Sequence, residues 1–234
     1  MCLNNWGGID HKVLEFHEYV NLFSGKSGSG KSTVMDAIQV ILYGSFSPSF
    51  LNKAADDAKN RRSVLSYLRG EQKDGSANRK DCDFCSVIAL EIEDTGTHII
   101  TCIGIAFEVR KSDSEIKKFV YFSHSGKMPE SEYLTEQGVC YSNQEIKKLV
   151  SARTKSDDNR GKGEVNRIYG SKEAYLGTLY DVILGYIDQN RFITMEKSAI
   201  ALKMTNGTGQ FIRDYMFPKN TSNTCLLYTS PSPR

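Results

Sequence analysis

A glycine-rich stretch, Ser24 to Gly44, constrains the fold of this 234-residue chain more than any other feature. Within it, four residues separate Gly25 from the run Gly30-Lys31-Ser32, which is the spacing of a phosphate-binding P-loop. Glycines let the backbone N–H groups approach a phosphate, the lysine adds a positive charge, and the serine hydroxyl suits Mg²⁺. The sequence therefore predicts a strand, a loop and a helix that together bind a nucleotide.

The flanks of the loop fit this prediction. Val13–Phe16 and Val20–Phe23 are short apolar segments that we expect to form strands before the loop. A helix is predicted from Ser32, with a stop at Gly44. Its apolar stripe at helical spacing consists of Val34, Ala37, Ile38, Ile41 and Leu42. The predicted nucleotide-binding residues are Gly25, Lys26, Ser27, Gly28, Ser29, Gly30, Lys31, Ser32 and Thr33, and Ser32 is also predicted to bind Mg²⁺.

The rest of the chain alternates between strand-like and helical patterns. Three segments rich in Val, Ile, Phe and Tyr predict strands joined by hairpin connections, and these are Ser86–Glu93, Thr97–Arg110 and Lys117–Ser123. Helices are predicted in two short pieces within Asn52–Gly70, over Asn143–Arg153 and Lys172–Tyr186, and from Gln210 to Phe217. Trp6, the only tryptophan, is expected to pack in the core or at a strand edge. The pattern is that of an α/β protein.

Composition narrows the cellular setting. With 39% hydrophobic and 25% charged residues, the chain has the balance of a soluble globular protein. Its net charge of +2 argues neither for nor against nucleic acid as a partner. No apolar run is long enough to span a membrane, and the first residues do not resemble a secretory signal. We therefore expect a cytoplasmic protein with no membrane partner.

Two features of a complete transporter-type ATPase are missing from the sequence. One is an apolar strand that ends in Asp-Glu, the acidic site that hydrolysis requires, and the other is an LSGGQ-like signature. The nearest candidate strand, Leu90–Asp94, alternates between apolar and acidic residues and is typical of a half-exposed hairpin strand. We therefore expect this chain to bind nucleotide poorly or moderately and to hydrolyse it hardly at all.

Several stretches resemble the ATPase heads of SMC-type proteins, and most closely those of the MukB-like and Wadjet JetC-like group. The first is Asn5-Trp6-Gly7-Gly8-Ile9-Asp10 together with the P-loop, in which Ser27 replaces the usual Asn. The others are FLNKAADDAKNRRSVLSYLRG, which ends at Gly70, then GYIDQNRFITMEKSAIALK and QFIRDYMF. The likeness covers most of Asn4–Phe217. It implies an α/β P-loop NTPase, the N-terminal lobe of an ABC-type head with an antiparallel β subdomain and following helices, over residues 1–217.

The resemblance also implies cofactors and further site residues. ATP and Mg²⁺ would be the cofactors, and Gln189 would bind Mg²⁺ as a Q-loop glutamine, the alternative being a surface glutamine in a turn. Arg61, Arg62 and Arg69 would contact DNA or nucleotide, the alternative being a solvated helix face. Basic side chains that contact phosphates give salt-dependent binding without sequence preference.

In such proteins the acidic site and the signature come from a C-terminal half, beyond a long coiled coil. Residues 218–224 would then begin the coiled-coil arm. The last ten residues, CLLYTSPSPR, back-translate to a transposase adapter used in sequencing libraries. We therefore expect 225–234 to be an adapter-derived artefact and the biological sequence to continue after Thr224, the alternative being a natural Ser/Pro-rich tail.

The partners implied are a second copy of the head in an ATP-bound dimer, kleisin-like and accessory subunits, and DNA. The setting would be nucleoid-associated in the bacterial cytoplasm, in chromosome condensation or plasmid defence. Two other functions stay open at this point. One is a RecF- or RecN-like DNA repair ATPase, and the other is a compact P-loop kinase for a small molecule.

Overall fold

The computed structural model describes the chain except for residues 27, 49–50, 52–62, 73–74, 157–164 and 201–234. The chain divides into two units, Met1–Gln189 and Asn190–Arg234. The predictions made for Ser27, Arg61, Arg62 and residues 210–217, 218–224 and 225–234 therefore lie outside the described residues. In the second unit the structure describes α5, which starts at the boundary and spans Gln189–Ile200. Within α5 the Thr194 hydroxyl donates to the Asn190 carbonyl at 2.7 Å.

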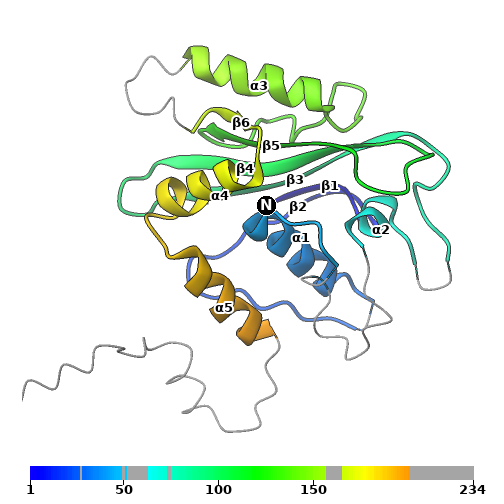
Figure 1. Ribbon diagram of the computed structural model, residues 1–234, viewed down its shortest axis with the longest axis horizontal. Coiled ribbons are helices and arrows are strands. Elements are labelled where there is room, and N and C mark those ends of the chain that lie inside the picture. The colour runs from blue at the N-terminus through cyan, green and yellow to red at the C-terminus, as the bar shows by residue number, and fades with distance from the viewer. Residues whose placement is uncertain (27, 49–50, 52–62, 73–74, 157–164, 201–234) are drawn as a thin grey trace, which may run out of the picture. The chain divides into compact units, whose positions relative to one another are not determined.

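The first unit contains a six-stranded sheet in the order β2-β1-β3-β4-β5-β6, in which every neighbouring pair is antiparallel (Figure 1). The strands are β1 Cys2–Trp6, β2 Ile9–Val13, β3 Phe84–Glu93, β4 Ile100–Val109, β5 Lys118–Ser125 and β6 Arg167–Tyr169. The helices are α1 Lys31–Tyr43, α2 Val64–Arg69, α3 Asn143–Ser156, α4 Lys172–Gly177 and the π-helix η2 Thr178–Ile183. The three strands predicted from residue 86 onward and the helices predicted in this unit are confirmed, apart from the first piece of Asn52–Gly70, which lies outside the described residues. The helix predicted over Lys172–Tyr186 differs in detail, because it is α-helical over Lys172–Gly177, π-helical over Thr178–Ile183 and ends there.

The long hairpin of β3 and β4 shows why these residues form strands. The two strands pair over their whole length, from Phe84 opposite Val109 to Glu93 opposite Ile100. Asp94 stabilises the connection, because its carboxylate accepts hydrogen bonds from two backbone N–H groups of the turn, at 2.8 and 3.0 Å. The predicted hairpin therefore has both a side-chain pattern that suits strands and a turn that satisfies its own backbone.

Helices cover both faces of the sheet. Helix α3 lies on one face, and α1 and α4 lie on the other (Figure 1). Between α3 and the sheet is a cluster of buried side chains that comprises Cys2, Val87, Ala89, Ala106, Phe122, Tyr133, Cys140, Ile146 and Val150. Because both faces are covered, β4 is buried along almost its whole length. None of the helices that the structure describes is long and apolar enough to cross a bilayer.

Helix α1 is held firmly at its C-terminal end. It ends at Gly44, which adopts a left-handed conformation with φ of 53° and confirms the predicted stop. Three tyrosine hydroxyls donate to carbonyls at this end, where a helix has no internal donors left. These bonds join Tyr175 to Ile41 at 2.9 Å, Tyr180 to Leu42 at 3.0 Å and Tyr121 to Gly44 at 2.6 Å. Strand β5, α4 and η2 thus fix the helix at the end opposite the loop.

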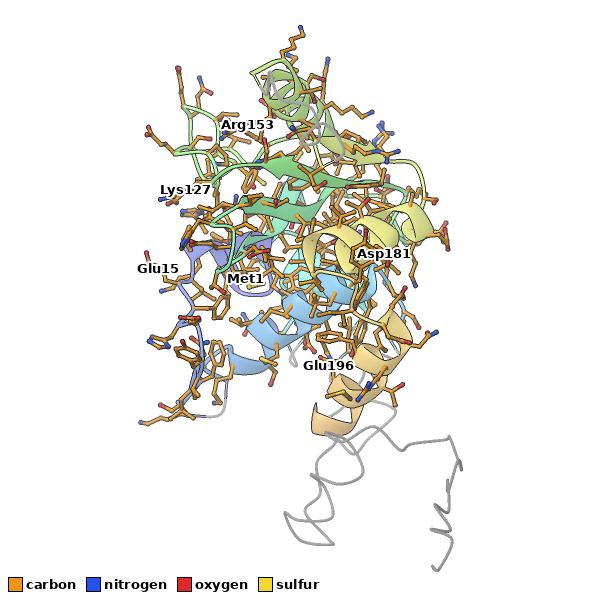
Figure 2. All side chains as sticks on the ribbon, turned by 90° about the vertical axis from the view of Figure 1, so that its left-hand side faces the viewer. Met1, Glu15, Lys127, Arg153, Asp181 and Glu196 are labelled. Carbon is orange, nitrogen blue, oxygen red and sulfur yellow. The ribbon has the colours of Figure 1, made fainter. Side chains whose placement is uncertain are left out.

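The strands predicted immediately before the loop are wrong. The second strand ends at Val13, and residues 14–24 form no strand. Figure 2 shows this segment leaving the sheet after Glu15. Its apolar side chains are exposed, with Tyr19 at 79%, Val20 at 78% and Leu22 at 89%. The physical reason is that no described strand lies beside this segment to pair with its backbone or cover its side chains.

Candidate nucleotide-binding site

The loop before α1 has the backbone geometry that its glycines allow. Gly25, Gly28 and Gly30 have φ values of 153°, 84° and 88°, in a region that residues with a Cβ rarely adopt. A Cβ built on Gly28 or Gly30 would meet nothing within 4 Å. These two glycines are therefore required by the turn of the backbone rather than by packing within the chain, and the space beside them is open to a ligand.

The ammonium group of Lys31 is bound by the loop itself. It donates to the carbonyls of Gly25 at 2.7 Å and Lys26 at 2.9 Å, and to the hydroxyl of Ser29 at 3.2 Å. These contacts bring together four of the predicted binding residues. A phosphate held by the loop would meet this ammonium group, which would exchange one of these neutral acceptors for a charged one.

The N-terminus of α1 is free of the groups that usually neutralise it. The N-cap is Gly30, which has no side chain to accept a hydrogen bond, and the first turn contains no acidic residue. The first N–H groups of the helix and its positive dipole end are thus available to an anion. Ser32, the predicted Mg²⁺ ligand, is exposed in this turn, and Thr33 is half-buried. This end of the helix therefore offers N–H donors to a triphosphate and a hydroxyl oxygen to its metal ion.

The same turn contacts a buried set of side chains, of which the sequence predicts only Trp6 as a core residue. The indole N–H of Trp6 donates to the Thr33 carbonyl at 2.8 Å. The Trp6 ring stacks on Tyr67 with centroids 5.0 Å apart and planes 6° apart. The Tyr67 hydroxyl in turn donates to the carboxylate of Asp36, one turn further along α1. Core packing of Trp6 is confirmed, whereas Asp36 and Tyr67 were missed. A carboxylate within an apolar helix was the available signal, because burial requires a partner for it.

Two glycines let the backbone approach this turn closely. Gly7, between β1 and β2, has φ of 59°, and a Cβ there would lie 2.6 Å from Cγ2 of Thr33. Its N–H donates to the Tyr67 carbonyl at 2.8 Å. Gly70, with φ of 66°, ends α2, and a Cβ there would lie 2.6 Å from the Gly7 carbonyl oxygen. The buried Arg79 donates to that same oxygen at 2.5 Å. The β1–β2 turn, α2 and the start of α1 therefore form one tightly packed corner.

Two further predicted site residues, Arg69 and Gln189, lie within the described residues. Arg69, at the end of α2, directs its guanidinium to the β4–β5 connection, where it donates to the carbonyls of Asp113 at 2.5 Å and Lys111 at 3.2 Å. Gln189 is the half-buried first residue of α5. The roles predicted for Arg69 in DNA or nucleotide contact and for Gln189 in Mg²⁺ binding stay predictions.

Comparison with known proteins supports the loop assignment. Residues 1–58 match the family model described as the P-loop containing region of AAA domain. No curated protein matches the chain. The matched segment includes the loop, α1 and the β1–β2 turn that packs behind them. The chain thus carries a P-loop nucleotide-binding region of the AAA type.

Proposed function

We propose that this chain is the ATP-binding half of an SMC-like ATPase head that works on DNA. The observation that carries the nucleotide-binding part is the open glycine loop, with the Lys31 ammonium group at its mouth and an uncapped helix behind it. The resemblance of Asn5–Asp10, the P-loop and Phe50–Gly70 to SMC-type heads supports the finer assignment.

The residues of the loop suit MgATP in distinct ways. Gly28 and Gly30 leave room for a phosphate beside the backbone, and Lys31 supplies a fixed positive charge. The exposed Ser32 hydroxyl would hold Mg²⁺, which neutralises phosphate charge when bound. The site therefore offers backbone N–H groups and a positive charge to the phosphates, and a hydroxyl oxygen to Mg²⁺.

The exposed segment 14–24 supports a head that is completed by another part of the protein or by a partner. Exposed apolar side chains such as Val20 and Leu22 rarely follow one another along a whole segment of a folded protein. The segment that leads into a P-loop is normally a central strand of the sheet. We propose that a strand from the C-terminal half, which would also carry the acidic site, pairs with this segment. The second head, kleisin-like and accessory subunits, DNA and the nucleoid setting belong to the same proposal.

The sheet favours this function over a compact kinase. A self-contained P-loop kinase is built on a parallel sheet with helices as crossovers. In the part of the chain that the structure describes, the strands of the sheet pair antiparallel throughout. A RecF- or RecN-like repair ATPase shares the head, so the downstream sequence distinguishes it from the SMC-like proposal.

Nucleotide binding is tested by titrating the purified chain with a fluorescent ATP analogue and Mg²⁺. Lys31→Ala should weaken binding about 10- to 100-fold, because a hydrogen bond to a charged group contributes about 1.5–3 kcal/mol. Lys12→Ala removes the same charge from an exposed position on β2 and should bind like the parent chain. Equal affinities for the parent and Lys31→Ala would overturn the assignment of the loop.

A separate experiment tests the split-head proposal, in which the acidic site and the signature lie in a C-terminal half beyond a long coiled coil. Sequencing the source locus beyond the codon for Thr224 should reveal long heptad repeats, then a signature motif and an apolar strand ending in acidic residues. A short coiled coil would favour the RecF-like alternative. A native stop codon directly after the codon for Arg234 would refute the split-head proposal and leave nucleotide binding unaffected.

A further inference from the structure

Three contacts from separate elements converge on the first two turns of α1. From β1, the Trp6 indole N–H reaches the Thr33 carbonyl at 2.8 Å. From α2, the Tyr67 hydroxyl reaches the Asp36 carboxylate. From the β1–β2 turn, Gly7 approaches Thr33 so closely that no side chain fits between them. The first two turns of the helix are thus held by three other parts of the fold.

These contacts lie in the interior. Trp6 is 0%, Tyr67 2% and Asp36 3% exposed. The stacked rings of Trp6 and Tyr67 join the two hydrogen bonds into one rigid group, because each ring restricts the rotation of the other. A side chain in such a group holds its partner more accurately than a mobile surface contact does.

We propose that Trp6, Tyr67 and Asp36 act as positioning residues for the nucleotide site, a role that rests on the proposed nucleotide binding. They hold the turn that contains Ser32 and Thr33 in the orientation that aims its N–H groups and the Ser32 hydroxyl at the phosphates. The three residues touch no phosphate themselves. They act through the backbone of Thr33 and through Asp36, which lies one helical turn after Ser32.

The opposite end of α1 provides a matched control. Tyr175 is also a buried tyrosine whose hydroxyl donates to α1, at the Ile41 carbonyl. Tyr67→Phe and Tyr175→Phe therefore each remove one buried hydroxyl that binds the same helix. A purely structural role would give the two variants similar nucleotide affinities. A positioning role predicts that only the change beside the loop weakens binding.

The experiment measures the dissociation constant of a fluorescent ATP analogue with Mg²⁺, together with the thermal midpoint, for the parent chain, Trp6→Phe, Tyr67→Phe and Tyr175→Phe. Trp6→Phe and Tyr67→Phe should each raise the dissociation constant about fivefold or more, which corresponds to ~1 kcal/mol. Tyr175→Phe should stay within about twofold of the parent, although it also loses a buried hydrogen bond. Equal affinities for Tyr67→Phe and Tyr175→Phe would overturn the proposal.

Trp6 supplies a second signal because it is the only tryptophan in the chain. Its emission should change on addition of MgATP in the parent and in Tyr175→Phe, and the change should be smaller in Tyr67→Phe. Equal changes in the two tyrosine variants would contradict the proposed role. If Trp6→Phe does not fold, Tyr67→Phe carries the test, because it keeps the stacked ring.

Hydrogen exchange tests the positioning role independently of nucleotide binding. If the parent chain binds no nucleotide, the proposed function fails, and exchange of the ligand-free chain still tests the positioning. Amides 34–37 should exchange faster in Tyr67→Phe than in Tyr175→Phe. Identical exchange at these amides would show that the three residues do not hold this end of the helix.

Discussion

Gly30→Ala is the substitution that tests the loop geometry most directly. Gly30 has φ of 88°, and an added Cβ would meet nothing within 4 Å, so the cost is conformational alone. A residue with a Cβ in the left-handed region is disfavoured by roughly 1–2 kcal/mol. Alanine also restricts the unfolded chain, which offsets about 0.4–1 kcal/mol of this cost.

Gly8→Ala is the control variant, because comparison with it removes the effect of alanine on the unfolded chain. Gly8 lies in the β1–β2 turn, its φ is outside the left-handed region, and a Cβ there would also meet nothing within 4 Å. Both variants gain the same restriction of the unfolded chain, so the difference between them isolates the strain at Gly30. We expect Gly30→Ala to be about 1–2 kcal/mol less stable than Gly8→Ala. In a domain of this size that corresponds to a difference of roughly 2–8 °C in the thermal midpoint.

Urea unfolding of both variants, followed by circular dichroism, measures this difference. MgATP titration of the same samples measures the functional consequence, since relief of the strain would turn the backbone N–H groups away from the phosphates. Gly30→Ala should bind at least about tenfold more weakly than Gly8→Ala. If the two variants matched in both stability and affinity, the positive φ at Gly30 would not be required, and the reasoning would be refuted.

Three further predictions concern the sheet and the core. Burial lowers the pKa of His124, so the unfolded chain binds a proton at this residue more readily than the folded chain does. The free energy of unfolding should therefore decrease as the pH falls through about 6.5. Urea midpoints at pH 7.5 and 5.5 should differ less in His124→Gln than in the parent. Thiol labelling with peptide mapping should modify exposed Cys82 in the folded chain, and Cys102, whose pKa burial raises to about 12, only on unfolding. Gly104→Ala should lower the thermal midpoint more than Gly8→Ala does, because its Cβ would collide with the Ile88 carbonyl of the neighbouring strand.

The periodicity of apolar residues correctly predicted the elements whose turns and caps are stabilised by residues nearby in the sequence. The β3–β4 hairpin followed from apolar and β-branched residues around a turn whose Asp94 binds its own backbone. Helix α1 was predicted from its apolar stripe and from Gly44, because glycine is favoured in the left-handed conformation that ends a helix. These signals depend on residues that are neighbours along the chain, so the sequence alone contains them.

The same reasoning failed where the outcome depended on distant residues. Val20–Phe23 has the composition of a strand, yet a strand needs a neighbour for its backbone, and the described part of the chain places none beside it. The stripe predicted for α1 also omitted Asp36, because periodicity counts only apolar residues. Asp36 is buried since Tyr67, 31 residues away, supplies a hydroxyl for it.

The sequence by itself therefore determined the phosphate-binding loop, because its glycines, lysine and serine are adjacent and their spacing specifies the chemistry. Only the tertiary structure decided what holds that loop in place. Trp6 precedes Thr33 by 27 residues, and nothing in their spacing predicts the hydrogen bond that joins them. Such contacts arise when sheet and helices pack into one interior, where each buried polar group must find a partner wherever the fold places it.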